Sequence, residues 1–241
     1  MTETTQKIGN DPVIDQMFKV GAHFAYSRSR RHPSAVPFIF GAKNRVEIFD
    51  LEKTKASLET AKNFAKKMAS EGKQILFVGG KNEARDAVLN SAKSADLPYV
   101  AGRWIGGTIT NFGEIRGRVE RLLDLTSKRE KGELAKYTKM ERLLIDREIE
   151  RLDKTFAGLI PMKGIPKAIF VVDSKREKIA VAEARKAGVQ VIALSSSDCD
   201  ISDIDFPISA NDSSVGSIRF FVNEIAEAYK SGKVQNANIK M

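Results

Sequence analysis

The stretch AIFVVDSKREKIAVAEARKAGVQVIAL, residues 168–194, holds the pattern that decides the fold. Its two ends, Ala168–Asp173 and Val189–Leu194, are nearly continuous apolar runs, which are typical of strands covered on both faces. We predict a helix between them that continues through Lys186. A strand, a helix and a second strand in this order predict parallel strands within one sheet.

The same alternation extends along most of the chain. The run ILFVGG, residues 75–80, predicts another buried strand. A helix that ends at Gly72 is predicted by apolar residues spaced three and four apart, namely Leu58, Ala61, Ala65 and Met68. Further strands are expected at 46–51 and near 99, and further helices at 82–94 and 214–230. The sequence therefore predicts an α/β fold, Rossmann-like or flavodoxin-like, with a doubly wound and mainly parallel sheet.

Residues 110–156 interrupt this alternation, because they are rich in charge and contain no apolar run long enough for a buried strand. Apolar residues repeat at steps of three and four on both sides of Gly132, as in coiled coils, at Ile115, Val119 and Leu122 and at Ile145, Ile149, Leu152 and Phe156. We predict an inserted antiparallel α-helical coiled-coil hairpin. Its second arm, at about 20 residues, would span about 30 Å.

The predicted organisation has four parts. Residues 1–36 form an N-terminal helix and a basic extended segment, in which Asp11-Pro12 marks the helix start and Gly21 its end. Residues 37–108 and 159–230 form a discontinuous α/β domain around the inserted hairpin at 109–158, and residues 231–241 form a flexible tail. We expect the basic segment to face solvent and to become ordered only on binding.

Charge and cysteine content bound the function. Forty basic and 31 acidic side chains give a net charge of +9, which favours polyanionic partners, nucleic acid first and anionic membrane second. Six basic residues and no acidic one lie between Lys19 and Arg45, while five aspartates and no Lys or Arg lie between Ser195 and Ile218. The lone Cys199 excludes an intramolecular disulfide and a four-cysteine metal site. With no apolar leader or membrane-spanning run, the expected location is the cytoplasm.

Three constellations suit catalysis or ligand binding only weakly. The turn Gly79-Gly80 after a predicted strand could hold a phosphate, but it lacks both phosphate-binding signatures and is interpreted as a plain turn. His23 and His32 are the only histidines, and a catalytic role is not expected for either. Closely spaced aspartates from Asp198 to Asp205 could bind Mg²⁺, but their spacing is not that of an EF-hand. We interpret them as a solvated acidic loop turned away from any bound RNA.

The densest unusual cluster is GRWIGGT, residues 102–108, which places the only tryptophan beside an arginine and a glycine pair. Trp104 could be buried at the root of the hairpin, with the glycines forming a turn. It could also belong to a nucleic-acid surface, with Arg103 reaching a phosphate. Both interpretations can hold together.

At these residues the sequence resembles the bacterial ribosomal protein S-two family. GRWIGGTITNF (Gly102–Phe112) is similar to that family's R-W-L-G-G-T-L-T-N-F, and PFIFGAKNRVEIFDLEKT (Pro37–Thr54) is similar to a second family motif. Residues 168–194 and 211–221 match in family order and spacing. The chain departs from the family pattern at Ala25, Tyr26, His32 and Arg45.

The resemblance implies a structural constituent of the small ribosomal subunit that binds rRNA between head and body, with no enzymatic activity, no cofactor and no metal. It implies contacts with head proteins and with the large mRNA-binding ribosomal protein S-one. The candidate rRNA-binding residues are Arg28, Arg30, Arg31, His32, Lys43, Arg45, Arg103 and Trp104, which would neutralise phosphates and read RNA shape.

Two alternatives stay open at this point. A cytosolic nucleotide- or sugar-phosphate-binding enzyme could use the Gly79-Gly80 turn and the carboxylates of residues 198–205, since doubly wound sheets bind ligands at the carboxyl ends of their strands. A protein that binds free mRNA or DNA outside ribosomes is the other. The charge pattern and the missing nucleotide fingerprints disfavour the enzyme.

Overall fold

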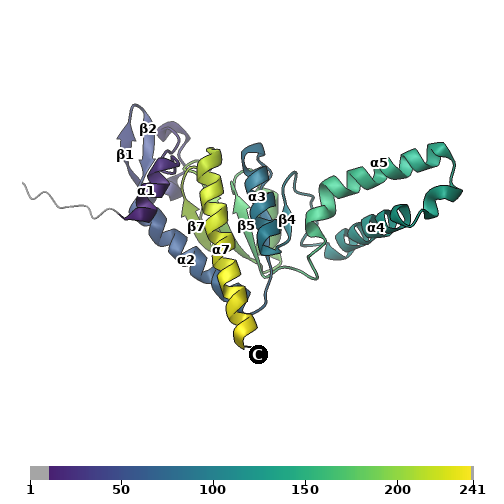
Figure 1. Ribbon diagram of the computed structural model, residues 1–241. Helices are drawn as coiled ribbons and strands as arrows, with labels where there is room; N and C mark the ends of the chain where they lie inside the picture. Colours follow the sequence, from purple (N-terminus) through teal and green to yellow (C-terminus); the bar gives the residue numbers. More distant parts are fainter. Residues whose placement is uncertain (1–10, 240–241) are drawn as a thin grey trace, which may run out of the picture.

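The computed structural model describes residues 11–239 and has the predicted α/β architecture (Figure 1). Its central sheet has five parallel strands in the spatial order β4-β3-β5-β6-β7. The strands are β3 (Ile75–Val78), β4 (Tyr99–Val100), β5 (Ala168–Val172), β6 (Gln190–Ser195) and β7 (Phe206–Ser209). Strand order reverses between β3 and β5, so the sheet is doubly wound in the flavodoxin-like order. No helix within residues 11–239 is long and apolar enough to cross a membrane.

Helices cover the sheet on both faces. One face is covered by α2 (Leu51–Ser70), α3 (Asn82–Ala95) and α7 (Val215–Ile239), and the other by α6 (Lys178–Lys186) and the start of α4 (Phe112–Glu130).

Successive strand residues alternate between two fully buried apolar layers. Phe77 and Phe170 lie in the first layer, and Val78 and Val171 lie in the second. Because both faces of the sheet are buried, β3, β5 and β6 have continuous apolar sequences rather than alternating patterns. The predicted strands at 75–80, 168–173 and 189–194 are confirmed.

Helix α2 illustrates how local sequence sets element ends. The side chain of Asp50 accepts hydrogen bonds from the amides of Glu52 and Lys53 and so caps the amino end. Gly72, at a φ of 70°, lies just beyond the carboxyl end in the left-handed region that favours glycine. The predicted apolar stripe is buried, at Leu58, Ala61, Ala65 and Met68.

Helix α7 differs from the prediction because it continues through Ile239, where a flexible tail was expected from residue 231. The reason is continued packing on α2. Tyr229 donates a hydrogen bond to the carbonyl of Lys73 at 3.1 Å. A Cβ added to Gly232 would lie 2.3 Å from the carbonyl oxygen of Lys66. Tertiary contact thus holds the helix at Gly232, just beyond the predicted end at residue 230. Residues 240–241 of that expected tail, and residues 1–10 of the expected N-terminal part, lie outside the described residues.

The inserted segment forms a helical hairpin that projects from the sheet (Figure 1). Helix α4 leads through the short 3₁₀ helix η3 (Glu133–Lys136) to α5 (Lys139–Phe156). Thr138 and Glu141 form a capping box at the start of α5. The arms share a small apolar cluster of Leu122, Leu125, Ile149 and Leu152. The supercoiling of a coiled coil stays a prediction, as does the division of the chain into four parts.

The root of this hairpin presses directly on the edge of the sheet. Gly158 follows α5 in the turn η4 (Ala157–Leu159). A Cβ added to Gly158 would lie 2.2 Å from the carbonyl oxygen of Tyr99 in β4. No side chain fits at this contact without displacing backbone, so the hairpin root and β4 are held at a fixed close approach.

The N-terminal region begins with α1 (Pro12–Lys19), which Asp11 caps and after which Gly21 adopts a φ of 73°, as predicted. A two-stranded antiparallel hairpin follows, separate from the main sheet, with strands β1 (Ile39–Lys43) and β2 (Val46–Phe49). Strand β1 was not predicted, and neither was β7 in the main sheet.

The basic segment between these elements is not the extended, solvent-facing chain that was expected. It forms two 3₁₀ turns, η1 (Arg28–Arg30) and η2 (Pro33–Phe38). Its backbone is tied to the loop after β6, because the His32 amide donates to the Ser197 carbonyl at 2.8 Å and the Tyr26 amide donates to the Ser197 hydroxyl at 3.1 Å. The expectation that this segment becomes ordered only on binding stays a prediction.

Candidate nucleic-acid interface

The arginines of the basic segment differ sharply in how available they are. Arg28 is exposed and forms no ion pair among the described residues. The guanidinium of Arg30 lies 4.0 Å from the ring centre of Tyr26 and 3.6 Å from a carboxylate oxygen of Asp198. It remains more than half exposed, so one face is free for a phosphate.

Arg31 points inward and has a structural partner. Its guanidinium donates to Oε1 of Glu47 at 2.7 Å, and the Glu47 side chain is only 3% exposed. The second carboxylate oxygen of Glu47 has no hydrogen-bond partner within the described part of the chain. Arg31 is therefore the main compensation for a buried charge, and its head group is largely used up by that pair.

The two histidines occupy structural positions. Nδ1 of His32 accepts from the amide of Ser34 and contacts the Ser34 hydroxyl at 2.7 Å, which caps the turn η2. The ring is partly exposed, and Nδ1 lies 3.7 Å from a carboxylate oxygen of Asp200. His23 is buried between the rings of Phe18 and Phe24, and burial lowers its pKa.

The acidic loop packs against the basic segment. Asp198 pairs with Arg30 and with Lys175, the latter at 2.9 Å, and its side chain is largely buried. Cys199 beside it is fully buried, and burial raises the pKa of its thiol to about 12. Its carboxylates thus pair with cations that are distant in sequence, and its orientation away from bound RNA stays a prediction.

The turn of the β1–β2 hairpin presents two free cations. Asn44 and Arg45 have φ values of 51° and 66°, which gives the tight two-residue turn that twisted antiparallel strands prefer. Lys43 and Arg45 are exposed and form no ion pair among residues 11–239. Both candidates thus lie where a polyanion can reach them.

Phe40 was missed by the sequence interpretation and is the most exposed large apolar residue described, at 81%. The pairing of β1 with β2 shifts between Ile39 and Gly41, so Phe40 is the unpaired residue of a β-bulge. A bulge turns its extra side chain out of the regular pleat. The signal in the sequence was the Phe40-Gly41 step, where alternation breaks before a basic turn.

The remaining candidates, Arg103 and Trp104, lie between β4 and α4, where the chain enters the helical hairpin. Figure 1 shows this hairpin on the opposite side of the molecule from β1 and β2. Trp104 is 7% exposed and belongs to the second apolar layer of the sheet. Its indole N–H donates to the carboxylate of Glu183 on α6 at 3.2 Å. Arg103 is exposed. The structure thus supports the packing interpretation for Trp104 and leaves only Arg103 accessible.

Glu183 organises the whole turn from Trp104 to Thr110. Beyond the indole, it accepts hydrogen bonds from the amides of Gly107 at 2.7 Å, Ile109 at 3.2 Å and Thr110 at 3.4 Å. Burial alone would raise its pKa, but these donors outweigh burial and hold the pKa below its ordinary value. A buried carboxylate that gathers several donors fixes the backbone from which the hairpin starts.

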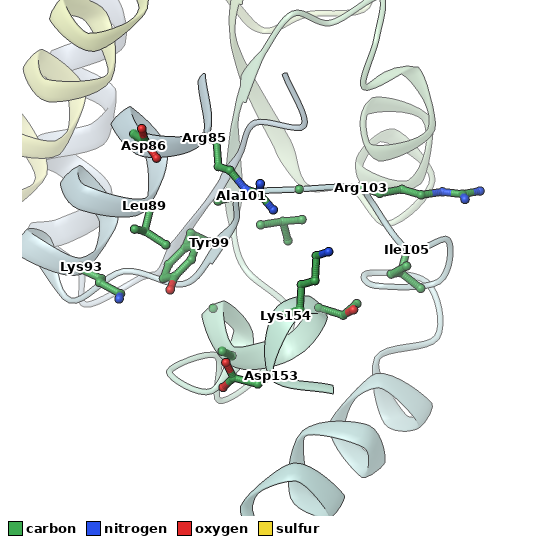
Figure 2. Close-up of a pocket in the computed structure, with 15 residues that line it drawn as sticks. Arg85, Asp86, Leu89, Lys93, Tyr99, Ala101, Arg103, Ile105, Asp153 and Lys154 are labelled. Atoms are coloured by element: carbon green, nitrogen blue, oxygen red, sulfur yellow. The ribbon is translucent and has the colours of Figure 1, made fainter. Parts of the chain in front are cut away.

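A cavity of about 710 Å³ lies beside this turn, between α3, the loop after β4 and the end of α5 (Figure 2). Its lining includes Arg85, Lys93, Arg103 and Lys154. Figure 2 shows the head groups of Arg85 and Lys154 pointing toward one another, while Arg103 points away. This basic cavity was not predicted, because its residues come from three separate elements.

The crevice at the carboxyl ends of β3 and β5, where doubly wound sheets bind ligands, is filled by the chain itself. Lys81 bonds to Asp173 at 2.7 Å and to Asp212 at 3.1 Å. Burial would lower the pKa of Lys81, but Asp212 and Asp173 raise it. Sulfur of Cys199 and oxygens of both aspartates lie within 4.8 Å of one another, a metal-like grouping whose cationic partner here is the Lys81 ammonium.

The glycine turn after β3 is also closed to phosphate. Glu177 accepts the amide hydrogen of Gly80 at 3.1 Å, and a Cβ added at Gly80 would lie 2.3 Å from the same carboxylate oxygen. A carboxylate therefore occupies the position in which an anionic ligand would bind the turn. The nucleotide- or sugar-phosphate-binding enzyme finds no support in this geometry.

These features define a class: a basic α/β scaffold protein with an inserted helical hairpin and a ligand crevice closed by its own charged side chains. The S-two family model, described as Ribosomal protein S2, matches residues 17–232. The chain belongs to this family.

Curated relatives agree along nearly the whole chain, and each is named small ribosomal subunit protein uS2. The relative from Chloroflexus aggregans is 39% identical over 228 residues, covering 95% of this chain and 96% of its own length. Those from Coprothermobacter proteolyticus and Helicobacter hepaticus are 39% and 40% identical, covering 91% and 92% of this chain and 82% and 84% of their own. The family is one of ribosomal proteins, and the enzyme alternative is not supported.

Proposed function

We propose that this chain is a structural constituent of the small ribosomal subunit and that it binds rRNA between the head and the body of that particle. The observation that carries the proposal is its similarity, over 95% of its length, to proteins named for the small subunit. The net charge of +9 suits an rRNA partner, because neutralising phosphates releases counterions. Its place of action would be the ribosome in the cytoplasm.

The rRNA surface that we propose has two parts. At one end, Arg28, Arg30, Lys43 and Arg45 supply exposed cations, and Phe40 supplies an exposed ring on which an unpaired base can stack. At the other end, Arg103 reaches a phosphate from a turn that Trp104 and Glu183 hold in place. Arg31 and His32 position this surface, since their polar groups are engaged within the protein.

The helical hairpin supplies a third contact in this proposal. Helix α5 carries exposed Met140, Leu143 and Leu144 next to the cations Lys139, Arg142 and Arg147. An exposed apolar cluster bordered by charge is typical of a surface that docks on a partner. Ribosomal head proteins, and the large mRNA-binding protein S-one where it is present, are the partners that the family resemblance implies.

Sedimentation tests the proposal directly. Native lysate is fractionated on a sucrose gradient in low salt and again after a high-salt wash, and the chain is quantified by mass spectrometry. We expect about one copy per small subunit in low salt and release as salt rises, because phosphate contacts dominate the affinity. A free peak at the monomer position in both gradients would contradict the proposal.

Charge variants connect that result to the surface. Arg28→Ala with Lys43→Ala and Arg45→Ala should release the chain at lower salt than the parent. Lys62→Ala with Lys66→Ala and Lys67→Ala, which also removes three cations but from α2, is the matched control. Equal release of both variants would remove the N-terminal cations from the interface.

A further inference from the structure

The cavity at the hairpin root is lined by more cations than carboxylates. Arg85, Lys93, Arg103 and Lys154 line it, and none of them forms an ion pair with any of residues 11–239. Two carboxylates, Asp86 and Asp153, also line the cavity, so cations remain in excess. Arg30 and Arg31 of the basic segment, by contrast, have acidic partners in Asp198 and Glu47.

Two of these cations are aimed at one position. The Nε of Arg85 donates to the carbonyl of Ala101 at 3.1 Å, which fixes the stem of the side chain. From there its head group points toward that of Lys154, which comes from the end of α5 on the opposite wall (Figure 2). Like charges that face one another repel, and an anion bound between them would attract both.

The rest of the lining is suited to a flat, partly apolar group. Leu89, Ile105 and the half-buried ring of Tyr99 contribute apolar surface to the lining. The volume of about 710 Å³ lies within the range of sites that bind small organic ligands. An aromatic ring beside a cation pair matches the two parts of a nucleotide, its base and its phosphate.

We propose that this cavity receives one unpaired nucleotide of the bound rRNA, with its phosphate between Arg85 and Lys154 and its base against Tyr99. The inference rests on the proposed function and names the ligand at one part of that surface. A carboxylate from a protein partner would satisfy the two cations but would leave the Tyr99 ring without a flat partner. RNA therefore fits the lining more completely than an acidic peptide does.

Binding at this position would also fix the direction of the hairpin. The cavity is walled by α3 on the sheet side and by residues 153–158 on the hairpin side. A nucleotide that contacts both walls bridges the α/β domain and the insertion. The bound particle, rather than the free chain alone, would then set the angle of α4 and α5.

The test uses the full chain bound to small subunits that lack it. After ultraviolet irradiation and digestion, mass spectrometry identifies peptides that carry a nucleotide. We expect an adduct on the tryptic peptide 94–103, which contains Tyr99, and loss of that adduct in the variant Arg85→Ala with Lys154→Ala. The slope of log affinity against log salt should fall by about 0.7 for each lost contact to single-stranded RNA.

Controls separate this cavity from the general interface. Lys66→Ala with Lys67→Ala removes equal charge from α2 and should keep the adduct on residues 94–103. If the alanine pair is unstable in a melting experiment, Arg85→Gln with Lys154→Gln replaces it. Binding of the parent chain without any adduct on this peptide, or an adduct to a protein segment instead, overturns the cavity proposal alone. Failure of the parent chain to bind the particle overturns the proposed function as well.

Discussion

The basic segment of residues 28–32 and the cavity at the hairpin root are both rich in cations, but they use them in opposite ways. In the segment, Arg31 is committed to buried Glu47, and Arg30 shares Asp198 with Lys175. In the cavity, Arg85 and Lys154 face one another without a carboxylate between them. A high density of cations in the sequence therefore does not mean that those cations are available to a ligand.

The difference has a physical origin in how the two regions are built. The basic segment crosses the carboxyl end of the sheet, where loop carboxylates also gather, so its cations meet partners that lie far away in sequence. The cavity forms between two structural units whose facing surfaces both carry cations. Ion pairs in the basic segment stabilise the fold. The unpaired cations of the cavity make favourable electrostatic interactions only when an anion binds there.

The largest expected effect on stability comes from removing the ion pair between Arg31 and Glu47. Arg31→Ala leaves the carboxylate of Glu47 buried without its partner, and we expect a loss of about 3–5 kcal/mol in the free energy of unfolding. Denaturant unfolding followed by circular dichroism measures the loss.

Two further variants define that result. Arg31→Met with Glu47→Leu replaces the pair by apolar groups and should recover most of the lost stability. Arg28→Ala, which removes an exposed cation without a partner in the described chain, should change stability by no more than about 0.5 kcal/mol. If Arg31→Ala and Arg28→Ala had equal free energies of unfolding, the pair of Arg31 with Glu47 would not contribute to stability.

A smaller effect is expected where the hairpin is anchored. Glu183→Ala leaves the donors of Trp104, Gly107 and Ile109 without an acceptor, and we expect a loss of about 2–3 kcal/mol. Hydrogen exchange should rise in the turn 104–110 more than in β5. An equal rise everywhere would show a general loss of stability rather than a local anchor.

The same carboxylate predicts a pH dependence. The folded chain lowers the pKa of Glu183 from its ordinary value, so its carboxylate stabilises the fold above the unfolded-state pKa. This contribution is lost as pH falls through the folded-state pKa. Unfolding free energies measured from about pH 6 down to about pH 3 should therefore decline less steeply in Glu183→Gln than in the parent. Parallel curves for the two proteins would contradict the assignment.

The smallest effect on stability is expected at Phe40, an exposed side chain that carries no charge. Phe40→Ala should leave the free energy of unfolding within about 0.5 kcal/mol of the parent. It should weaken binding to the small subunit by about 1–3 kcal/mol through lost base stacking, with an unchanged salt slope. Arg45→Ala should instead reduce the slope. Ile179→Ala, which removes an exposed apolar side chain from α6, is the control, and an effect equal to that of Phe40→Ala would exclude stacking.

How much of the fold the sequence predicts depends on whether the signal is local. Strands β3, β5 and β6 were found because burial on both faces writes a continuous apolar run. Strand β1 was missed because the bulge at Phe40 breaks its alternation, and β7 was missed because it is a short edge strand that contains Pro207. The continuation of α7 past residue 230 includes a close contact of Gly232 with α2, which no local pattern contains.

The candidate site was less predictable, for a related reason. Sequence density located Arg28, Lys43 and Arg45 on accessible surface, and it also selected Arg31, whose partner lies 16 residues away. Arg85 and Lys154 were not selected, because one lies on α3 and the other at the end of α5. Pairing and convergence of charges are properties of the folded chain.

The close approach of Gly158 to Tyr99 has a mechanical consequence. Helix α5 has 18 residues and so extends about 27 Å from that contact. A rotation of about 10° at the contact would displace the far tip by about 5 Å, which follows from the helical rise per residue. Because Gly158 has no side chain, the end of α5 can lie directly against Tyr99. The position of the hairpin tip therefore depends on the absence of a single methyl group at this contact.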